Sequence, residues 1–272
     1  MEELLREWDG ECVVVRHDPP TGAWIFIAVH DRTLGMAMGG CRMHVYRTPR
    51  EGLRDALRLA QGMTLKWAAI EFPFGGGKAV LAVPRPLEGE ERAGLLLRFG
   101  ELVESLGGMY GTGVDLGTSP ADMAVIGRRT RYVFGRPPEA GGTGDPGPWT
   151  ALGVFCGIRA ACERVFGSAE LAGRSVLVQG AGGVGAPLVA RLAEAGARVL
   201  VTDALPGRAE RMAREHGAEI VAPEEAYDAE CDVLAPCAVG AILNARSIAR
   251  LRCRIVAGSA NNQLEEEADA ER

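Results

Sequence analysis

Lysine occurs at only two positions in the chain, and both invite a chemical explanation. The 272 residues include 30 lysines and arginines together, and only Lys66 and Lys78 are lysines. A lysine that is removed from water loses proton affinity, so it can act as an acid or a base near neutral pH. A genome that favours arginine codons would also leave few lysines, and composition alone favours that explanation.

The stretch FPFGGGK, residues 72–78, places three glycines directly before Lys78. A phosphate-binding P-loop requires GxxxxGK followed by Ser or Thr. Here the glycine spacing differs and Ala79 follows the lysine, which argues against a P-loop. Apolar residues flank the stretch, which argues against a flexible linker. We therefore expect a tight backbone that lets substrate approach closely and presents Lys78 in a confined site.

A second glycine-rich stretch, VLVQGAGGVGAPLVARL, is typical of dinucleotide binding. Gly180, Gly182 and Gly185 form a GxGxxG pattern between a predicted strand and a predicted helix. The helix N-terminus would offer amide donors and a positive dipole end to a pyrophosphate. Asp203 ends the next predicted strand, where a carboxylate would bind the adenosine ribose and favour NAD over NADP. Arg208 nearby leaves NADP as the alternative cofactor.

These candidate residues must be positioned by two groups of elements. The first half of the chain predicts two β-rich runs, a helix with its N-cap at Thr48 that carries Lys66, a short strand after the glycines, a second helix, and a strand and loop that bears Asp115. The second half alternates strands at 175–179, 198–202, 231–234 and 253–256 with helices at 150–165, 182–195 and 205–216.

This order predicts an α/β protein of two domains. Residues 1–135 would form an N-terminal α/β substrate-binding, catalytic and oligomerisation domain with a mostly β-sheet core. Residues 150–272 would form a Rossmann-type, doubly wound dinucleotide-binding domain. The intervening residues 136–149, rich in proline and glycine, read as a hinge or loop.

Composition excludes several classes of function. The net charge of −6 and the pI near 5.4 argue against nucleic acid or an anionic membrane as the main partner. No apolar run approaches the roughly 18–20 residues that span a bilayer. Seven scattered cysteines without a CxxC pair suggest reduced thiols in a cytoplasmic protein. His17, His30 and His44 lack the spacing of metal ligands, so we expect no metal site.

Eight motifs, in order and at compatible spacing, resemble those of the NAD(P)-dependent amino-acid dehydrogenases that act on glutamate, leucine, phenylalanine or valine. They cover nearly the whole chain: MGGCRM (38–43), GMTLKWAA (62–69), FGGGKAV (74–80), VDLGT (114–118), WTALGV (149–154), QGAGGVG (179–185), APCAVGAILN (235–244) and AGSANNQL (257–264). The resemblance points to the leucine, phenylalanine and valine branch.

The resemblance implies roles for individual residues. Lys78 would be the catalytic acid/base, Asp115 would assist its proton transfer, and Lys66 would bind the substrate α-carboxylate. The other implied substrate-binding residues are Met38, Gly39, Gly40, Met63, Gly113 and Asn262. The implied cofactor-binding residues are Thr150, Gly180, Ala181, Gly182, Gly183, Val184, Gly185, Asp203, Cys237, Ala238, Ala260 and Asn261.

Simpler explanations exist for some of these residues. From spacing alone, Asp115 could cap a helix that begins near Pro120, and Asn261 and Asn262 could be ordinary turn residues. Cys237 lies in the apolar run LAPCAVGA, which favours inert packing over a role as nucleophile.

The residue before the GG of the GGxR motif bears on the substrate. In relatives that act on glutamate a lysine at this position meets the side-chain carboxylate, and here the residue is Met38. A charged substrate tail against methionine would lose water without gaining a partner. The resemblance therefore implies an apolar L-amino acid, with Gly113 leaving room for a larger side chain.

The predicted function is NAD-dependent oxidative deamination of such an amino acid to the 2-oxo acid and ammonia, in a homo-oligomer. The chain stops after NNQLEEEADAER, whereas relatives continue, so a C-terminal segment is expected to be missing. The alternatives are a glutamate dehydrogenase and a catalytically impaired, NAD-binding member of the fold.

Overall fold

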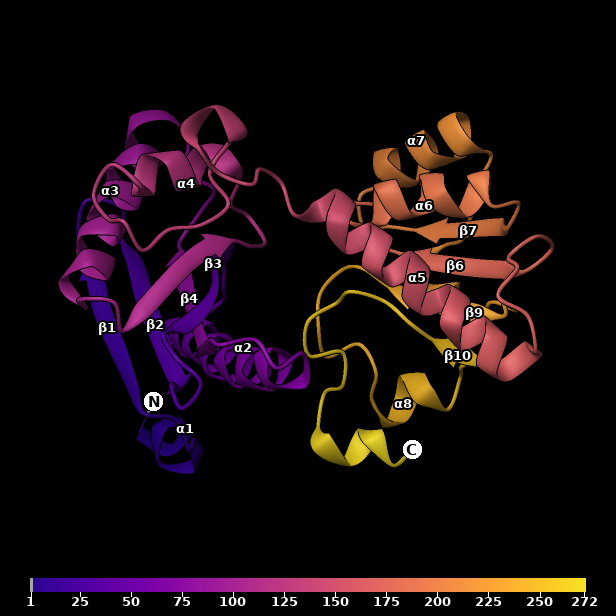
Figure 1. Ribbon diagram of the computed structural model, residues 1–272, viewed down its shortest axis with the longest axis horizontal. Coiled ribbons are helices and arrows are strands. Elements are labelled where there is room, and N and C mark those ends of the chain that lie inside the picture. The colour runs from indigo at the N-terminus through magenta and orange to yellow at the C-terminus, as the bar shows by residue number, and fades with distance from the viewer. Residues whose placement is uncertain (1) are drawn as a thin grey trace. The chain divides into compact units, whose positions relative to one another are not determined.

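The computed structural model describes residues 2–272 and divides the chain into two compact units. The second unit spans Gly147–Arg272, and the first comprises the residues before it. Each unit has one five-stranded sheet with helices against it (Figure 1). All strand pairs of the second sheet are parallel. The predicted α/β class with a Rossmann-type second domain is confirmed.

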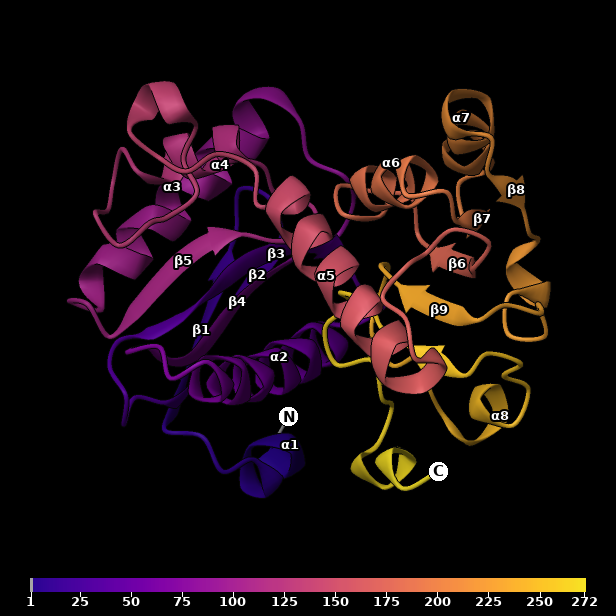
Figure 2. The same ribbon diagram turned by 45° about the vertical axis from the view of Figure 1, so that its right-hand side comes forward.

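The first sheet has the strand order β1-β2-β4-β3-β5 (Figure 2). Strand β2 pairs antiparallel with β1 and β4, whereas β3 pairs parallel with β4 and β5. The strands are β1 (Cys12–Asp18), β2 (Ala23–Asp31), β3 (Ala37–Val45), β4 (Gly75–Val83) and β5 (Tyr110–Val114).

Helices cover both faces of this sheet. Helix α2 (Pro49–Ala69) packs on one face, where Val80 and Ala82 of β4 lie, while Ala79 and Leu81 face α3 (Gly89–Ser105) and α4 (Pro120–Ile126). Because side chains alternate along a strand, Lys78 projects onto the α2 face. The short helix α1 (Glu2–Glu7) and the 3-10 turn η1 (Pro138–Ala140) complete the unit.

Thr48 begins α2 as predicted, since its side chain accepts a hydrogen bond from the Glu51 amide. The Glu51 carboxylate accepts from the Arg47 amide rather than from Thr48. Only half of a capping box is therefore present, and the cap still fixes the start of the helix that carries Lys66.

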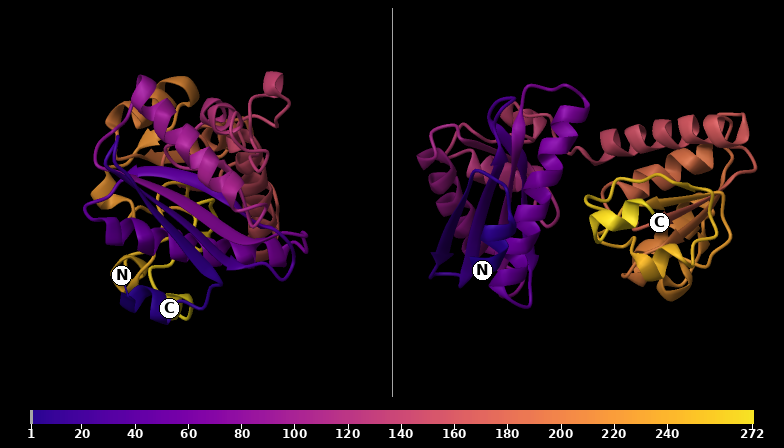
Figure 3. Two further views of the ribbon diagram at one scale, coloured as in Figure 1. Left: turned by 90° about the vertical axis from the view of Figure 1, so that its left-hand side faces the viewer. Right: turned by 90° about the horizontal axis from the view of Figure 1, so that it is seen from below.

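The second sheet has the order β10-β9-β6-β7-β8. Helices α5, α6 and α7 pack on the face that carries Val176, Val178 and Val201, and Figure 3 shows α5 lying along this unit. The elements are α5 (Gly147–Phe166), β6 (Ser175–Gln179), α6 (Gly185–Glu194), β7 (Arg198–Thr202), α7 (Pro206–His216), β8 (Glu219–Ile220), η2 (Pro223–Glu225), β9 (Val233–Pro236), α8 (Ala245–Ile248), β10 (Ile255–Val256) and η3 (Glu267–Ala270).

Five elements differ from the sequence-based prediction. Strand β4 includes the three glycines, which were expected to precede a strand. Strands β9 and β10 begin further along the chain than predicted, because Val233 and Ile255 are buried in the sheet whereas Cys231 and Cys253 before them are only partly buried. The short strand β8 and helix α8 were not predicted.

Candidate active site

Lys78 lies inside strand β4 with its side chain only 3% exposed. Its Nζ atom is 2.9 Å from Oδ1 of Asp115, the residue that directly follows β5. Burial lowers the pKa of Lys78, and the nearby Arg42 cation lowers it further, while Asp115 opposes both effects. The amine is therefore desolvated, paired with one carboxylate, and easier to deprotonate than an exposed lysine.

Asp115 does not cap a helix. Helix α4 begins at its own N-cap, Ser119, which exchanges hydrogen bonds with Asp122 in a capping box. Burial by itself would raise the pKa of Asp115, but Lys78 and Arg42 outweigh burial and hold that pKa at about 2. The carboxylate therefore stays charged beside the amine, and the capping explanation is wrong.

The glycines before Lys78 are required by packing inside the protein. A Cβ atom on Gly76 would lie 1.9 Å from Thr64 Oγ1 and 2.4 Å from Thr64 N, so α2 could not rest on the strand. A Cβ on Gly75 would lie 2.2 Å from the Asp31 carbonyl oxygen. The expectation that these glycines leave space for substrate is therefore wrong, because neighbouring protein atoms fill that space.

Gly39 and Gly40 of β3 allow a similarly close approach. A Cβ on Gly39 would lie 1.8 Å from the Gly77 carbonyl oxygen and 3.4 Å from Met63 Cγ, and a Cβ on Gly40 would lie 2.7 Å from Asp115 Cβ. Neither glycine is paired with a residue of β4, although the β3 residues before and after them are. The first unit thus brings these two glycines next to the residues around Lys78 and Asp115.

Lys66 is exposed on the last turns of α2. It follows Met63 by one helical turn, so the two side chains lie on neighbouring parts of the helix surface. Since Met63 reaches Gly39, Lys66 lies on the part of α2 that is close to β3.

Met38 lies among apolar side chains. Its carbonyl oxygen accepts a hydrogen bond of 3.1 Å from Trp67 Nε1. Met38 Sδ, Met36 Cε and Phe134 Cε2 would all meet a Cβ on Gly111 at 3.0–3.1 Å, so these side chains converge. A Cβ on Gly113 would meet only the Phe134 carbonyl oxygen, at 3.7 Å, which leaves room there. This part of the first unit suits an apolar group.

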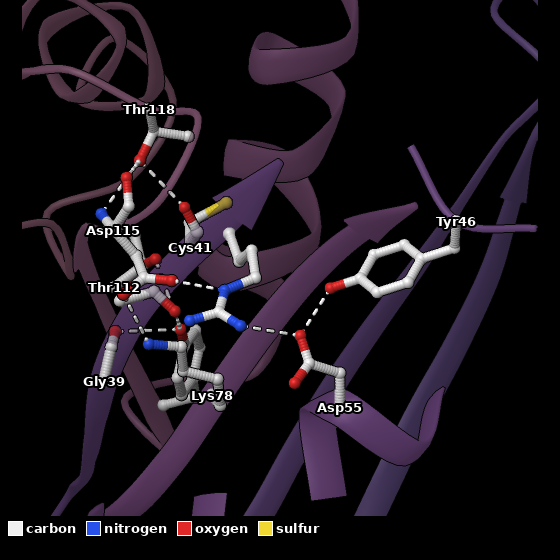
Figure 4. Close-up of polar contacts among 11 residues, drawn as sticks. Gly39, Cys41, Tyr46, Asp55, Lys78, Thr112, Asp115 and Thr118 are labelled. Atoms are coloured by element: carbon white, nitrogen blue, oxygen red, sulfur yellow. Dashed lines mark hydrogen bonds and ion pairs between the residues drawn. The ribbon is translucent and has the colours of Figure 1, made fainter. Parts of the chain in front are cut away.

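Sequence reasoning missed Arg42, which contacts Asp115 directly. Arg42 Nε donates to Asp115 Oδ2 over 2.8 Å, and Arg42 Nη1 donates to Asp55 Oδ2 over 2.8 Å. The Tyr46 hydroxyl also donates to Asp55 (Figure 4). One signal was available: Arg42 is a charged residue between the apolar Cys41 and Met43 of β3, and a buried arginine requires an acidic partner.

In the second unit the GxGxxG stretch forms the turn between β6 and α6. Gly180 has φ +99°, a conformation that favours glycine, and a Cβ on Gly185 would lie 1.7 Å from the Gly180 carbonyl oxygen. A Cβ on Gly182 would meet only Arg208, at 3.8 Å, and one on Gly183 would meet nothing within 4 Å. The turn is therefore tightly packed at Gly180 and Gly185, whereas the space beside Gly182 and Gly183, at the N-terminus of α6, is open.

Asp203 follows β7 and faces this turn. Its Oδ2 accepts a hydrogen bond from the Ala181 amide and its Oδ1 accepts one from the Leu205 amide, each over 2.8 Å. Arg208 Nη1 lies 3.8 Å from the same carboxylate. Asp203 therefore holds the glycine loop, and each oxygen retains acceptor capacity for another donor.

Two loops meet beside the turn. A Cβ on Gly180 would lie 2.8 Å from Ala238 Cβ, and the Cys237 amide donates to the Gln179 carbonyl. Ala260 donates to the Pro236 carbonyl, and a Cβ on Gly240 would meet the Asn261 carbonyl oxygen at 2.2 Å. Residues 236–241 and 257–262 are thus packed together at the carboxyl end of β9.

Asn262 lies at the end of these loops in an unusual conformation. Its φ is +48°, and its carbonyl accepts a hydrogen bond from the Ala241 amide. Asparagine tolerates the left-handed region better than most residues. Thr150 lies elsewhere in the unit, in the first turn of α5.

Cys237 and His30 have structural surroundings. Burial raises the pKa of Cys237, which fits an inert thiol. His30 hydrogen-bonds Thr64 and Asp9, as expected of a structural histidine. Within residues 2–272 no group of three histidine, cysteine or acidic residues is placed to hold a metal ion.

Comparison with known proteins identifies a family for this chain. The dimerisation domain of the Glu/Leu/Phe/Val dehydrogenases matches residues 21–132. Leucine dehydrogenase from Thermoactinomyces intermedius is 44% identical over 265 residues, which cover 97% of this chain and 72% of that protein. The chain belongs to the Glu/Leu/Phe/Val dehydrogenase family.

Solved structures of related dehydrogenases have the same fold. The crystal structure of L-tryptophan dehydrogenase from Nostoc punctiforme matches with a TM-score of 0.69 and 41% identity, covering 98% of this chain and 75% of that one. A hetero-hexameric glutamate dehydrogenase from Thermus thermophilus, in its Leu-bound form, matches with a TM-score of 0.78 and 27% identity, covering 99% and 74%.

Membership of the Glu/Leu/Phe/Val dehydrogenases identifies the chain as an amino-acid dehydrogenase, an oxidoreductase that acts on a CH–NH2 group. The predicted family and its leucine and phenylalanine branch are confirmed. In the part of the chain that the structure covers, no helix is long and apolar enough to cross a membrane.

Proposed function

We propose that this chain is an NAD-dependent dehydrogenase that oxidatively deaminates an apolar L-amino acid to its 2-oxo acid and ammonia, and catalyses the reverse amination. The observation that carries the proposal is the buried pair of Lys78 and Asp115. A lysine whose pKa is lowered by burial, next to a carboxylate that stays charged, suits repeated proton transfer near neutral pH.

The proposed reaction uses the two lysines differently. Lys66, exposed on α2, pairs with the substrate α-carboxylate as a cation. A bound NAD would supply the acceptor for the hydride that leaves Cα. The neutral Lys78 amine takes a proton from the water that attacks the resulting iminium carbon, and gives this proton to the nitrogen of the carbinolamine. The Lys78 amine then takes the hydroxyl proton as the C–N bond breaks, which forms the carbonyl of the 2-oxo acid and releases ammonia. Asp115 keeps its negative charge and stabilises the protonated form of Lys78.

The substrate side chain is proposed to be apolar. Met38 stands where relatives that act on glutamate have a lysine, and Met36 and Phe134 converge with it. A carboxylate brought to this position would lose its water without gaining a cation. The names of the relatives, leucine dehydrogenase and L-tryptophan dehydrogenase, support an apolar substrate without choosing between an aliphatic and an aromatic one.

The proposed cofactor site is the turn after β6. The open space above Gly182 and Gly183, at the N-terminus of α6, suits a pyrophosphate, which would accept hydrogen bonds from backbone amides. Asp203 would accept from the ribose hydroxyls, which favours NAD, while Arg208 is the residue through which a 2′-phosphate could be held. Ala181, Val184, Thr150, Cys237, Ala238, Ala260 and Asn261 are proposed to contribute to the same site.

We also propose that Gly39, Gly40, Met63, Gly113 and Asn262 contribute to substrate binding. A homo-oligomer is supported by the match of residues 21–132 to a dimerisation domain. The seven free cysteines fit a cytoplasmic location.

The test is formation of NADH with leucine, valine, phenylalanine, tryptophan and glutamate, measured for the wild type and for Lys78→Ala. We expect activity with one or more apolar amino acids, little with glutamate, and loss of activity in the variant. Preference for glutamate would favour a glutamate dehydrogenase. Measurable NAD binding without activity toward any amino acid would favour a catalytically impaired member of the family, and activity that survives in Lys78→Ala would reject Lys78 as the base.

A further inference from the structure

The Asp115 carboxylate is held from two sides. Its Oδ1 atom lies 2.9 Å from Lys78 Nζ, and its Oδ2 atom accepts a hydrogen bond of 2.8 Å from Arg42 Nε. The Arg42 and Asp115 side chains are only 12% and 13% exposed. A carboxylate with a fixed donor on each oxygen has little freedom to rotate, so Arg42 determines which way Asp115 faces Lys78.

Arg42 is held in turn by a second carboxylate. Arg42 Nη1 donates to Asp55 Oδ2, and the Tyr46 hydroxyl donates to the same oxygen (Figure 4). Burial and the Asp55 charge raise the pKa of Tyr46, so its hydroxyl keeps its proton as a donor. Asp55 belongs to α2, the helix that also carries Lys66. The contacts therefore run without a gap from Lys78 through Asp115 and Arg42 to α2.

We propose that Arg42 and Asp55 are positioning residues for the Lys78–Asp115 pair, with Arg42 orienting Asp115 and Asp55 orienting Arg42. The inference rests on the proposed function, because it assumes that Lys78 transfers the proton. Neither residue needs to touch substrate. Each acts through Asp115 and through its charge on the amine.

The charges of these two residues act on Lys78 in opposite directions. The charged groups that act on Lys78 are Asp115, which follows β5, Arg42 from β3 and Asp55 from α2, while β2 places Ala28 opposite. The titratable Cys41 and Tyr110 belong to the core on the other face of the sheet. Burial raises the pKa values of Cys41 and Tyr110, so both stay neutral. Arg42 lowers the pKa of Lys78, and Asp55 raises it.

The test is the pH dependence of kcat/KM for oxidative deamination. In a plot of kcat/KM against pH, the rising limb reports the loss of a proton that converts Lys78 to the neutral amine in the free enzyme. Removing the Arg42 cation raises the pKa of Lys78, so Arg42→Gln is expected to move the limb to higher pH by about one unit. Asp55→Asn removes an anion and is expected to move it to lower pH. Tyr46→Phe leaves the charges unchanged, so it is expected to lower kcat without moving the limb.

Controls separate positioning from stability. Arg98→Gln breaks another ion pair of the first unit, with the buried Asp18, and is expected to lower the unfolding midpoint without moving the limb. If Arg42→Gln does not fold, Arg42→Lys keeps the charge while losing one of the two hydrogen bonds. We expect it to lower kcat about tenfold or more with the limb unmoved.

Two results would overturn the inference. The positioning roles are rejected if the rising limb of the pH profile moves in the same direction in Arg42→Gln and Asp55→Asn, or moves in neither variant. They are also rejected if Arg42→Lys has the kcat of the wild type. If Lys78→Ala is inactive in the same experiments, only the positioning roles fail. If Lys78→Ala is active, the proposed function fails first.

Discussion

Lys78 Nζ and Asp115 Oδ1 lie 2.9 Å apart at a position where the lysine side chain is 3% exposed. The two residues come from neighbouring parts of one sheet, and the glycines at 39, 40 and 76 let β3, β4 and α2 approach closely enough to enclose them. An ion pair that is so fully buried adds little stability over a well-packed apolar pair, although removing one partner alone destabilises the protein. Its chemical value is an amine that can lose and regain a proton.

Replacing the amine should abolish catalysis without unfolding the protein. In Lys78→Met the apolar stem is retained and Asp115 keeps its hydrogen bond with Arg42. We expect kcat to fall at least about 100-fold, because the proposed general acid/base is lost, with NAD affinity unchanged. Steady-state kinetics and NADH-quenching titrations check both quantities. A variant with kcat within tenfold of the wild type would reject Lys78 as the base.

Removing the Asp115 charge should change how stability depends on pH. The pKa of Asp115 is held at about 2 in the folded protein, below its value in the unfolded chain. The Asp115 carboxylate therefore contributes fully to the free energy of unfolding at pH values above its pKa in the unfolded chain, and this contribution is lost as the pH falls toward 2. In Asp115→Asn this contribution is absent. We expect the variant to be less stable than the wild type at neutral pH, with the difference shrinking by roughly 2 kcal/mol between about pH 5 and pH 2.

Urea unfolding of both proteins across this pH range makes the measurement. Asp122→Asn is a comparison within the same unit, because the pKa of Asp122 is also lowered, by Arg92 and Ser119 against the effect of burial, but Asp122 does not contact Lys78. It should show a related loss of stability while retaining catalysis. A constant difference between Asp115→Asn and the wild type over the whole range would contradict the prediction.

Much of the fold follows from short-range patterns. The apolar spacing from Leu53 to Ala60 and the cap at Thr48 determine α2, and the strand–GxGxxG–helix order determines the turn at Gly180. Each of these signals lies within a short stretch of the sequence. The positions of Lys66 on α2 and Asp203 after β7 follow from them directly.

The contacts of the first unit could not be predicted in the same way. Arg42 meets Asp115, which is 73 positions away, only because β3 pairs with β5. Asp55 is close in sequence, but its contact depends on α2 lying across the face onto which Arg42 projects. The glycines at 75–77 were assigned to substrate approach because the atoms that fill their space, in Thr64 and Asp31, belong to other elements.

Two glycines of the first unit should respond differently to alanine. A Cβ on Gly76 meets backbone and side-chain atoms of Thr64 at 1.9–2.4 Å, so Gly76→Ala must push α2 away from β4. We expect it to cost about 3 kcal/mol or more of unfolding free energy. Gly113→Ala meets only one atom, at 3.7 Å, so it should fold normally. Chemical denaturation compares the two variants.

Gly113→Ala also tests the proposed substrate site. If the space at Gly113 receives the substrate side chain, a methyl group there should raise KM for phenylalanine or tryptophan more than for valine, by about tenfold. Equal KM changes for large and small substrates would remove Gly113 from the site.

The choice of cofactor should depend on Asp203 and Arg208. Asp203 Oδ2 accepts the Ala181 amide at 2.8 Å, and Arg208 Nη1 lies 3.8 Å from the carboxylate. Asp203→Ser removes the negative charge while retaining an acceptor, and frees Arg208 to meet a 2′-phosphate. We expect the ratio of kcat/KM for NAD to that for NADP to fall by about 100-fold. The double variant Asp203→Ser/Arg208→Gln should recover part of the lost preference for NAD, because the Arg208 cation can then no longer bind the 2′-phosphate. A wild type that already prefers NADP, or an unchanged ratio in Asp203→Ser, would assign cofactor choice to other residues.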